Sequence, residues 1–195
     1  MMAMSSSEPR APDVVRLRSL TAERLDLLEP LWRALLDRIR VPANVVAIVP
    51  HDESWPMRRR EYEELLSGGD SFGLVALRGD EPIGYAMVRV GDGPDPVWAT
   101  GGRYVELTSL SVAAGERDRG VGTRLLDEVE RRLADLGVDG LVIGVDAVND
   151  GALRFYERRG FKIGYHLLFG HLSAPAGGAG PAADESPETA SHGEA

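Results

Sequence analysis

The stretch from residue 104 to residue 145 limits the possible folds more than any other part of the chain. Residues 104–112 are rich in β-branched and apolar side chains, which is typical of a strand. Residues 121–136 then carry apolar side chains at helical spacing, and residues 141–145 are nearly all apolar, as in a strand covered on both faces. Two buried strands joined by a helix form a parallel β-α-β unit. The helical face consists of Val121, Leu125, Val129, Leu133 and Leu136.

Other patterns place this unit in a mixed sheet. Residues 14–18 and 161–169 alternate apolar and polar side chains, so we expect a short first strand and a final strand there. Residues 72–77 and 83–90 are β-rich, and the Arg-Gly-Asp-Glu-Pro sequence between them predicts a hairpin turn. The sequence therefore predicts an α+β or α/β fold with a mixed central sheet flanked by helices.

The N-terminal region has a helical pattern with one interruption. Thr21 and Glu23 indicate a helix start, and apolar side chains recur at helical spacing over residues 25–39. Pro30 interrupts this pattern, so we expect a kink or two short helices, followed by an irregular stretch over residues 41–56.

A run of three arginines that starts at residue 58 lies in the next expected helix, residues 57–66. Such a run could suggest nucleic-acid binding. Arg59 with Glu63, and Arg60 with Glu64, are spaced to pair across one helical turn. A solvated face that neutralises its own charge is therefore the better interpretation.

Length and composition predict one compact domain. The chain has 195 residues, and its two ends, residues 1–12 and 173–195, are poor in large apolar side chains. Burial there cannot offset the entropy of ordering, so we expect both ends to be flexible, the second as an acidic tail rich in Pro, Gly and Ala. The domain is therefore expected over residues 13–172.

Composition also excludes several classes of function. The formal net charge of −9 argues against nucleic acid as a partner, because a binder normally carries a basic face. The absence of cysteine excludes disulfides and thiolate sites. His166 and His171 would point to opposite faces of a strand, so no metal site is expected. Without a signal-peptide core or a membrane-length apolar run, we expect a cytoplasmic monomer or homodimer with no membrane partner.

Residues 117–122, Arg-Asp-Arg-Gly-Val-Gly, join the expected strand to the expected helix. A helix that begins directly after a strand presents unpaired amides and the positive end of its dipole. Gly120 and Gly122 let the backbone approach a diphosphate, and Arg117 and Arg119 add charge suited to phosphate oxygens. The segment fits neither a P-loop nor a three-glycine dinucleotide loop. The residues alone predict an anion at this helix start, with a tight turn as the alternative.

Two blocks of the sequence carry a resemblance to a known family. Arg117, Gly120 and Gly122 have the spacing Arg/Gln-x-x-Gly-x-Gly/Ala and follow Leu-Thr-Ser-Leu-Ser-Val. The second block is Asn149-x-x-Ala152-x-x-Phe155-Tyr156-x-x-x-Gly160-Phe161. Together they resemble the GNAT superfamily of acetyl-CoA-dependent N-acetyltransferases, with the specific part at about residues 104–161. The resemblance implies the GNAT fold, in which two parallel strands splay apart.

This resemblance implies acetyl-CoA as the acyl donor, with its pantetheine arm between the splayed strands. The backbone of Leu110, Ser111 and Val112 would hold the arm and the acyl carbonyl, while the side chains of Leu110 and Val112 can be ordinary core residues. The amides implied to bind the pyrophosphate belong to Arg117, Asp118, Arg119, Gly120, Val121, Gly122 and Thr123.

Tyr156 occupies the family's tyrosine position, which implies that its hydroxyl donates a proton to the departing CoA sulfur. The alternative is an aromatic side chain that packs beside Phe155. Asn149 can cap a helix over residues 149–159, which Gly160 can end. The resemblance implies that Asn149 also contacts the pantetheine arm.

Glu106 lies eleven residues before Arg117, where some members of the family place a general-base glutamate. Simple alternation would place it on the same strand face as Leu110 and Val112, unless a bulge intervenes. The alternative is a glutamate at the sheet margin that meets solvent or an arginine.

The implied function is acetyl transfer from acetyl-CoA to a primary amine by direct attack in a ternary complex. The alternative is a GNAT-like module that binds acyl-CoA, or regulates a partner, without chemistry. The acceptor, a small molecule or a peptide amine, is not identified by the residues. Its candidate contacts are His51, Asp52, Glu53, Trp55 and Trp98, for which a solvated loop and local packing are the alternatives.

Overall fold

The computed structural model describes residues 14–40, 48–93 and 102–168, and the chain divides into two units, residues 1–163 and 164–195. The expected flexible ends lie outside the described residues. The strands are β1 (Val15–Ser19), β2 (Phe72–Arg78), β3 (Glu81–Val90), β4 (Val105–Val112) and β5 (Val142–Ile143). The helices are the 3-10 helices η1 (Ala22–Leu28) and η2 (Ala114–Glu116), and the α-helices α1 (Glu29–Arg40), α2 (His51–Ser67), α3 (Val121–Asp135) and α4 (Asp150–Glu157).

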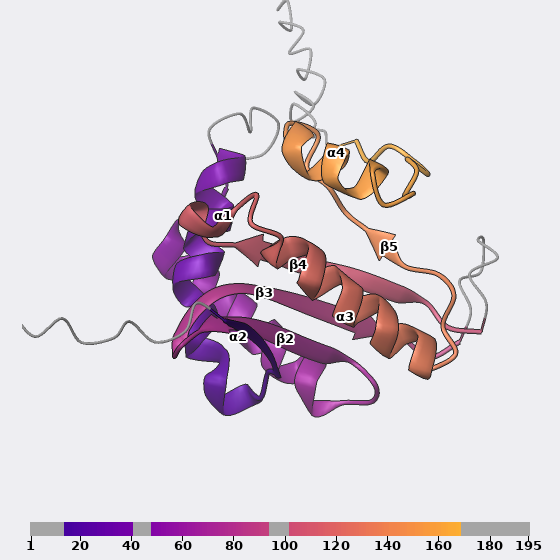
Figure 1. Ribbon diagram of the computed structural model, residues 1–195, viewed down its shortest axis with the longest axis horizontal. Coiled ribbons are helices and arrows are strands. Elements are labelled where there is room, and N and C mark those ends of the chain that lie inside the picture. Colours follow the sequence, from indigo (N-terminus) through magenta and orange to yellow (C-terminus); the bar gives the residue numbers. More distant parts are fainter. Residues whose placement is uncertain (1–13, 41–47, 94–101, 169–195) are drawn as a thin grey trace, which may run out of the picture. The chain divides into compact units, whose positions relative to one another are not determined.

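The five strands form one sheet in the order β1-β2-β3-β4-β5 (Figure 1). The first three pairs are antiparallel, whereas β4 and β5 are parallel, as the β-α-β pattern predicts. The parallel ladder joins Glu106 to Val142 and Leu107 to Ile143. Beyond this point the rest of β4 pairs with β3 alone among the described strands. The two parallel strands therefore diverge toward the end of β4.

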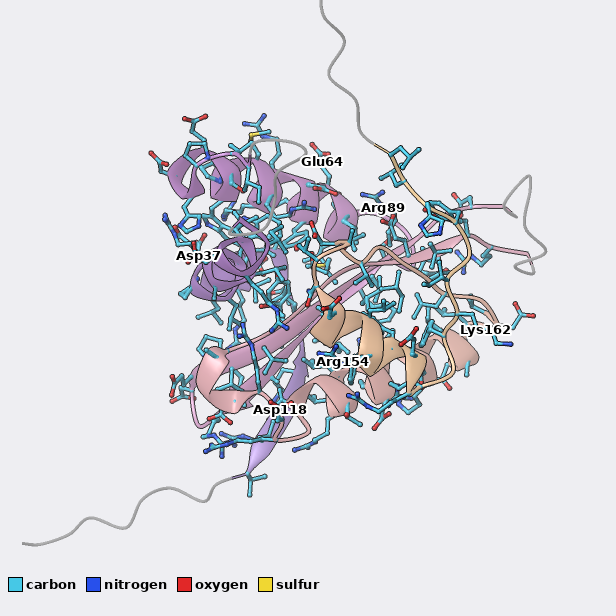
Figure 2. All side chains as sticks on the ribbon, turned by 90° about the horizontal axis from the view of Figure 1, so that it is seen from above. Asp37, Glu64, Arg89, Asp118, Arg154 and Lys162 are labelled. Atoms are coloured by element: carbon cyan, nitrogen blue, oxygen red, sulfur yellow. The ribbon has the colours of Figure 1, made fainter. Side chains whose placement is uncertain are left out.

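Two apolar cores lie on opposite faces of the sheet. Helix α3 buries Leu125 on one face, and α4 adds Tyr156 to the same core. Helices α1 and α2 cover the other face. Figure 2 shows this division, with Asp37 and Glu64 on α1 and α2 to one side and Arg154 on α4 to the other. Each large aliphatic side chain buried in these cores stabilises the fold by about 1.5–3 kcal/mol.

A bulge in β4 reverses which side chains face which core. The ladder between β3 and β4 shifts register at Thr108, which is opposite no residue of β3 in the ladder. Leu107 packs in the core of α3, whereas Ser109 accepts a hydrogen bond from a tyrosine on α2. Glu106 therefore faces α2, while Leu110 packs against the opposite core. The simple alternation from Glu106 to Leu110 is wrong because of this extra residue.

The N-terminal helices partly follow the sequence pattern. Pro30 is the second residue of α1, directly after η1, so the pattern does divide into two helices. The expected irregular stretch is wrong over residues 51–56, which are helical. Asp52 and Glu53 lie in the first turn of α2 and stabilise it through the helix dipole, despite Pro56. Residues 41–47 lie outside the described residues.

The final strand expected over residues 161–169 is not present as far as residue 168, and Phe169 lies outside the described residues. A strand needs a hydrogen-bonded neighbour, because its amides and carbonyls are otherwise unpaired. No described strand pairs with the outer edge of β5. Alternation of apolar side chains is therefore insufficient here to make a strand.

Candidate active site

The loop between β4 and α3 has a conformation that its residues explain. Gly120 is the N-cap of α3 and adopts a left-handed backbone, with φ +80°, which side-chain-bearing residues rarely adopt. Asp118, labelled in Figure 2, also has a positive φ of 58°. The first intrahelical bond of α3 runs from the Arg124 amide to the Gly120 carbonyl, at 3.0 Å. The amides of Val121, Gly122 and Thr123 thus precede the helical ladder and have no acceptor within the helix.

Gly122 marks the point where three elements converge. A Cβ added to it would lie 3.7 Å from Val112 Cγ2 and 3.8 Å from Phe155 Cζ, which are ordinary contacts. The end of β4, the start of α3 and helix α4 therefore meet around this residue. The protein itself leaves room for a side chain at position 122, so a need for glycine there would come from a ligand.

Two of the loop's charged residues hold its position. Glu116 accepts a hydrogen bond from Arg78 on β2 at 2.6 Å, and Arg119 lies 3.6 Å from the same carboxylate. The hydrogen bond from Arg78 lowers the pKa of Glu116. Arg119 is otherwise exposed to solvent, so it is available to an anion at the start of α3.

Arg117 and Arg38 bring two positive charges to the same end of the site. The Arg117 Nε donates to the Val112 carbonyl at 3.3 Å, which directs its side chain along the end of β4. Burial lowers the pKa of Arg117, and the positive charge of Arg38 on α1 lowers it further. Arg38 was not predicted from the sequence. Its position near the end of an amphipathic helix is equally typical of an arginine that is simply solvated.

Asn149 caps α4, as the sequence predicts. Its side-chain oxygen accepts a hydrogen bond from the Ala152 amide at 3.2 Å. The amide nitrogen of the same side chain is not used in this cap, so a second contact to a ligand is chemically compatible with it. The contact with a pantetheine arm stays a prediction.

Tyr156 lies in the α3 core, with 8% of its surface exposed. Its ring makes edge contacts with Phe155 and Phe161 at centroid distances of 5.1 and 5.8 Å. Its hydroxyl makes no hydrogen bond to any described residue, and burial raises its pKa well above the usual value. The packing beside Phe155 is confirmed, and the proton-donor role stays a prediction that this packing does not oppose.

Glu106 is held at the margin of the sheet. Its Oε2 lies 3.4 Å from Arg89 Nη1, and Arg89 Nη2 donates to Glu61 on α2 at 2.9 Å. The carboxylate also stands at the first rung of the β4–β5 ladder, opposite Val142, beside the point where the strands part. A base at this position stays a prediction. The contact with an arginine is the arrangement expected of the alternative.

The residues expected near the acceptor take three different positions. His51 Nε2 lies 2.9 Å from Asp37, so it links the start of α2 to α1. Trp55 is 5% exposed and packs as a core anchor rather than lining an open pocket. Asp52 and Glu53 form the first turn of α2, and Trp98 lies outside the described residues.

Comparison with known proteins decides the family. The model of the acetyltransferase (GNAT) family matches residues 32–161, which contain both sequence blocks and the β4–α3 loop. The chain belongs to this family. As a GNAT domain it contains the mixed sheet and the diverging parallel pair that the resemblance implies.

The relatives within the GNAT family have several names. An uncharacterised N-acetyltransferase of Mycobacterium tuberculosis is 34% identical over 90 residues, which is 46% of this chain and 52% of that protein. A mycothiol acetyltransferase of Brachybacterium faecium is 32% identical over 127 residues, 63% of this chain and 37% of that protein. The chain thus spans about half or less of these curated relatives.

Solved structures support the same fold. An aminoglycoside N-acetyltransferase in complex with CoA has a TM-score of 0.64 at 18% identity, covering 86% of this chain and all of that one.

In the stretches that the structure describes, no helix is long and apolar enough to cross a membrane. The same stretches contain no group of three acidic or histidine side chains placed to hold a metal ion.

Proposed function

We propose that this chain transfers an acetyl group from acetyl-CoA to a primary amine by direct attack within a ternary complex. One observation above all supports this function. The left-handed Gly120 begins α3 beside the place where β4 and β5 part, so an anion site and an open strand edge lie together. An acyl-CoA has the matching chemistry, because a diphosphate precedes an amide-containing arm.

The residues present fit such a donor. The amides that precede the α3 ladder, with Arg117 and Arg119 beside them, suit the diphosphate. Leu110, Ser111 and Val112 lie beyond the last rung shared with β5, so their backbone groups on that edge can pair with the amides of the pantetheine arm. The side chain of Ser111 is already engaged, since its hydroxyl donates to the Leu31 carbonyl at 3.0 Å.

The proposed chemistry balances with groups near the split. The neutral amine attacks the thioester carbonyl carbon, a C–N bond forms and the C–S bond breaks. The departing sulfur takes a proton from the Tyr156 hydroxyl, and the amine loses a proton to Glu106 or to a water relay. Transfer back to the tyrosinate through solvent resets the site. The backbone amide of Val112 is a candidate donor to the acyl oxygen.

A thiol-release assay with acetyl-CoA tests this function. The acceptors are an aminoglycoside, a polyamine, free amino acids and peptide N-termini, because the relatives' names give no single acceptor for this chain. We expect release of CoA thiol with at least one amine, and less release by Tyr156→Phe. Binding of CoA without thiol release across the panel would instead support a binding or regulatory module.

A further inference from the structure

Arg38 differs from most arginines on this surface in having no partner among the described residues. Arg33, five residues earlier on α1, pairs with Glu29 at 2.7 Å, and Arg159 pairs with Asp127 at 2.7 Å. Within the described part of the chain, Arg38 makes neither an ion pair nor a hydrogen bond. Its side chain nevertheless does not simply extend into solvent, because it lies against another element.

The guanidinium of Arg38 packs against Gly151. A Cβ added to Gly151 would lie 2.5 Å from Arg38 Nη2, closer than real Cβ contacts. Gly151 belongs to the first turn of α4, and the Asn149 oxygen lies 3.9 Å from the same Cβ position. Arg38 therefore reaches from α1, on one face of the sheet, to the start of α4, on the other.

The position of Arg38 also brings it close to Arg117, so that the two positive charges repel. Arg117 donates to a carbonyl, and the neighbouring Asp118 offsets only part of the positive charge, since the pKa of Arg117 is still lowered. Two guanidinium groups near the starts of α3 and α4 favour a group with at least two negative charges, which would remove this repulsion. A diphosphate satisfies that requirement.

We propose that Arg38, which lies outside the family's loop, is a further guanidinium ligand of the donor's diphosphate, beside Arg117 and Arg119, and that Gly151 is glycine to make room for it. This inference rests on the proposed function, because it concerns the same donor. Arg38 is a binding residue here and takes no part in the chemical step.

Binding measurements with CoA and two fragments test the inference. We expect Arg38→Gln to weaken binding of CoA and of dephospho-CoA by about ten-fold each, as for the loss of a charge-assisted hydrogen bond. Dephospho-CoA keeps the diphosphate but lacks the 3′-phosphate. Calorimetry measures both ligands, and an NMR titration measures pantetheine, which has no phosphate and should bind equally to both proteins.

Two variants serve as controls. Arg33→Gln removes a paired arginine from the same helix and should bind CoA as the wild type does. Gly151→Ala should displace the flexible end of Arg38 and weaken CoA binding by about three- to ten-fold. In an Arg38→Gln background, the added Gly151→Ala should have no further effect.

Several results would overturn the inference. These are unchanged CoA affinity in Arg38→Gln, an equal loss for pantetheine, a loss for CoA that dephospho-CoA does not share, or a wild type that binds no CoA. A different result would contradict the proposed reaction. If Arg38→Gln weakens CoA binding as expected but no amine elicits thiol release, the donor contact stands and the transferase activity does not.

Discussion

The surroundings of Tyr156 keep the proton on its hydroxyl. The ring is held between Phe155 and Phe161, and burial alone raises the pKa of the hydroxyl. A neutral phenol is a hydrogen-bond donor at every pH at which the enzyme would operate. The raised pKa also makes it a weaker acid, so full transfer to sulfur requires that the thiolate is equally desolvated.

Tyr156→Phe should lower turnover by about 100-fold and leave the affinity for CoA within about two-fold, because it removes the proton and keeps the ring packing. Steady-state kinetics and calorimetry measure the two effects. The thermal midpoint should not change, since the hydroxyl has no described hydrogen-bond partner. Turnover equal to that of the wild type would exclude the donor role.

Glu106→Gln should lower turnover, because glutamine keeps the contact with Arg89 but cannot accept a proton. Steady-state kinetics of both proteins measure this. Glu64→Gln, at an exposed position on α2, is the matched control. If the Glu106→Gln variant turns over as fast as the wild type, Glu106 is not the base.

At the scale of elements, local pattern predicted most of what lies near the site. The strand, loop and helix from residue 105 onward follow from periodicity and from Gly120, because each depends on neighbours in sequence. The face of the sheet on which Glu106 lies could not be predicted, since the bulge at Thr108 depends on pairing with β3. The position of Arg38 could not be predicted either, because its contact with Gly151 joins residues far apart in the chain.

The two loop glycines should respond differently to alanine. Gly120→Ala forces a side chain into a left-handed backbone and should lower the free energy of unfolding by about 1 kcal/mol. Gly122→Ala is sterically accepted and should leave that free energy equal or higher, yet weaken CoA binding where the diphosphate approaches. Urea denaturation and calorimetry measure both. Equal effects of the two substitutions on stability would contradict the assigned backbone roles.

At the scale of the whole first unit, ionic contacts on α3 connect the helix to the sheet. Glu128 accepts hydrogen bonds from Arg131 and Arg132, and these lower its pKa from 4.5 to about 2. Arg132 also donates to Ser19 at the end of β1 and lies over the ring of Phe72 on β2. Glu128 thus helps to orient an arginine that contacts both strands.

This arrangement predicts an acid-sensitive contribution to stability. Because the pKa of Glu128 is lowered by folding, its stabilisation is present above pH 4.5 and is lost as the pH falls toward 2. Glu128→Gln should lower the free energy of unfolding at pH 6 by less than about 1 kcal/mol, since Glu128 and its two arginines are all partly open to solvent. Urea denaturation should show this difference shrinking between pH 4.5 and pH 2. A difference that does not vary with pH would mean that packing, not charge, is responsible.

The two-rung ladder between β4 and β5 has a further consequence under the proposed function. Among the described strands, the end of β4 has a hydrogen-bonded neighbour on one side only, and a substrate rather than the polypeptide would act as the other neighbour. Recognition through main-chain groups does not depend on which residues stand at positions 110 and 112, provided that their side chains still fill the core. The acceptor of such a domain can change when the surrounding loops change, while the donor still pairs with the same main-chain groups of β4.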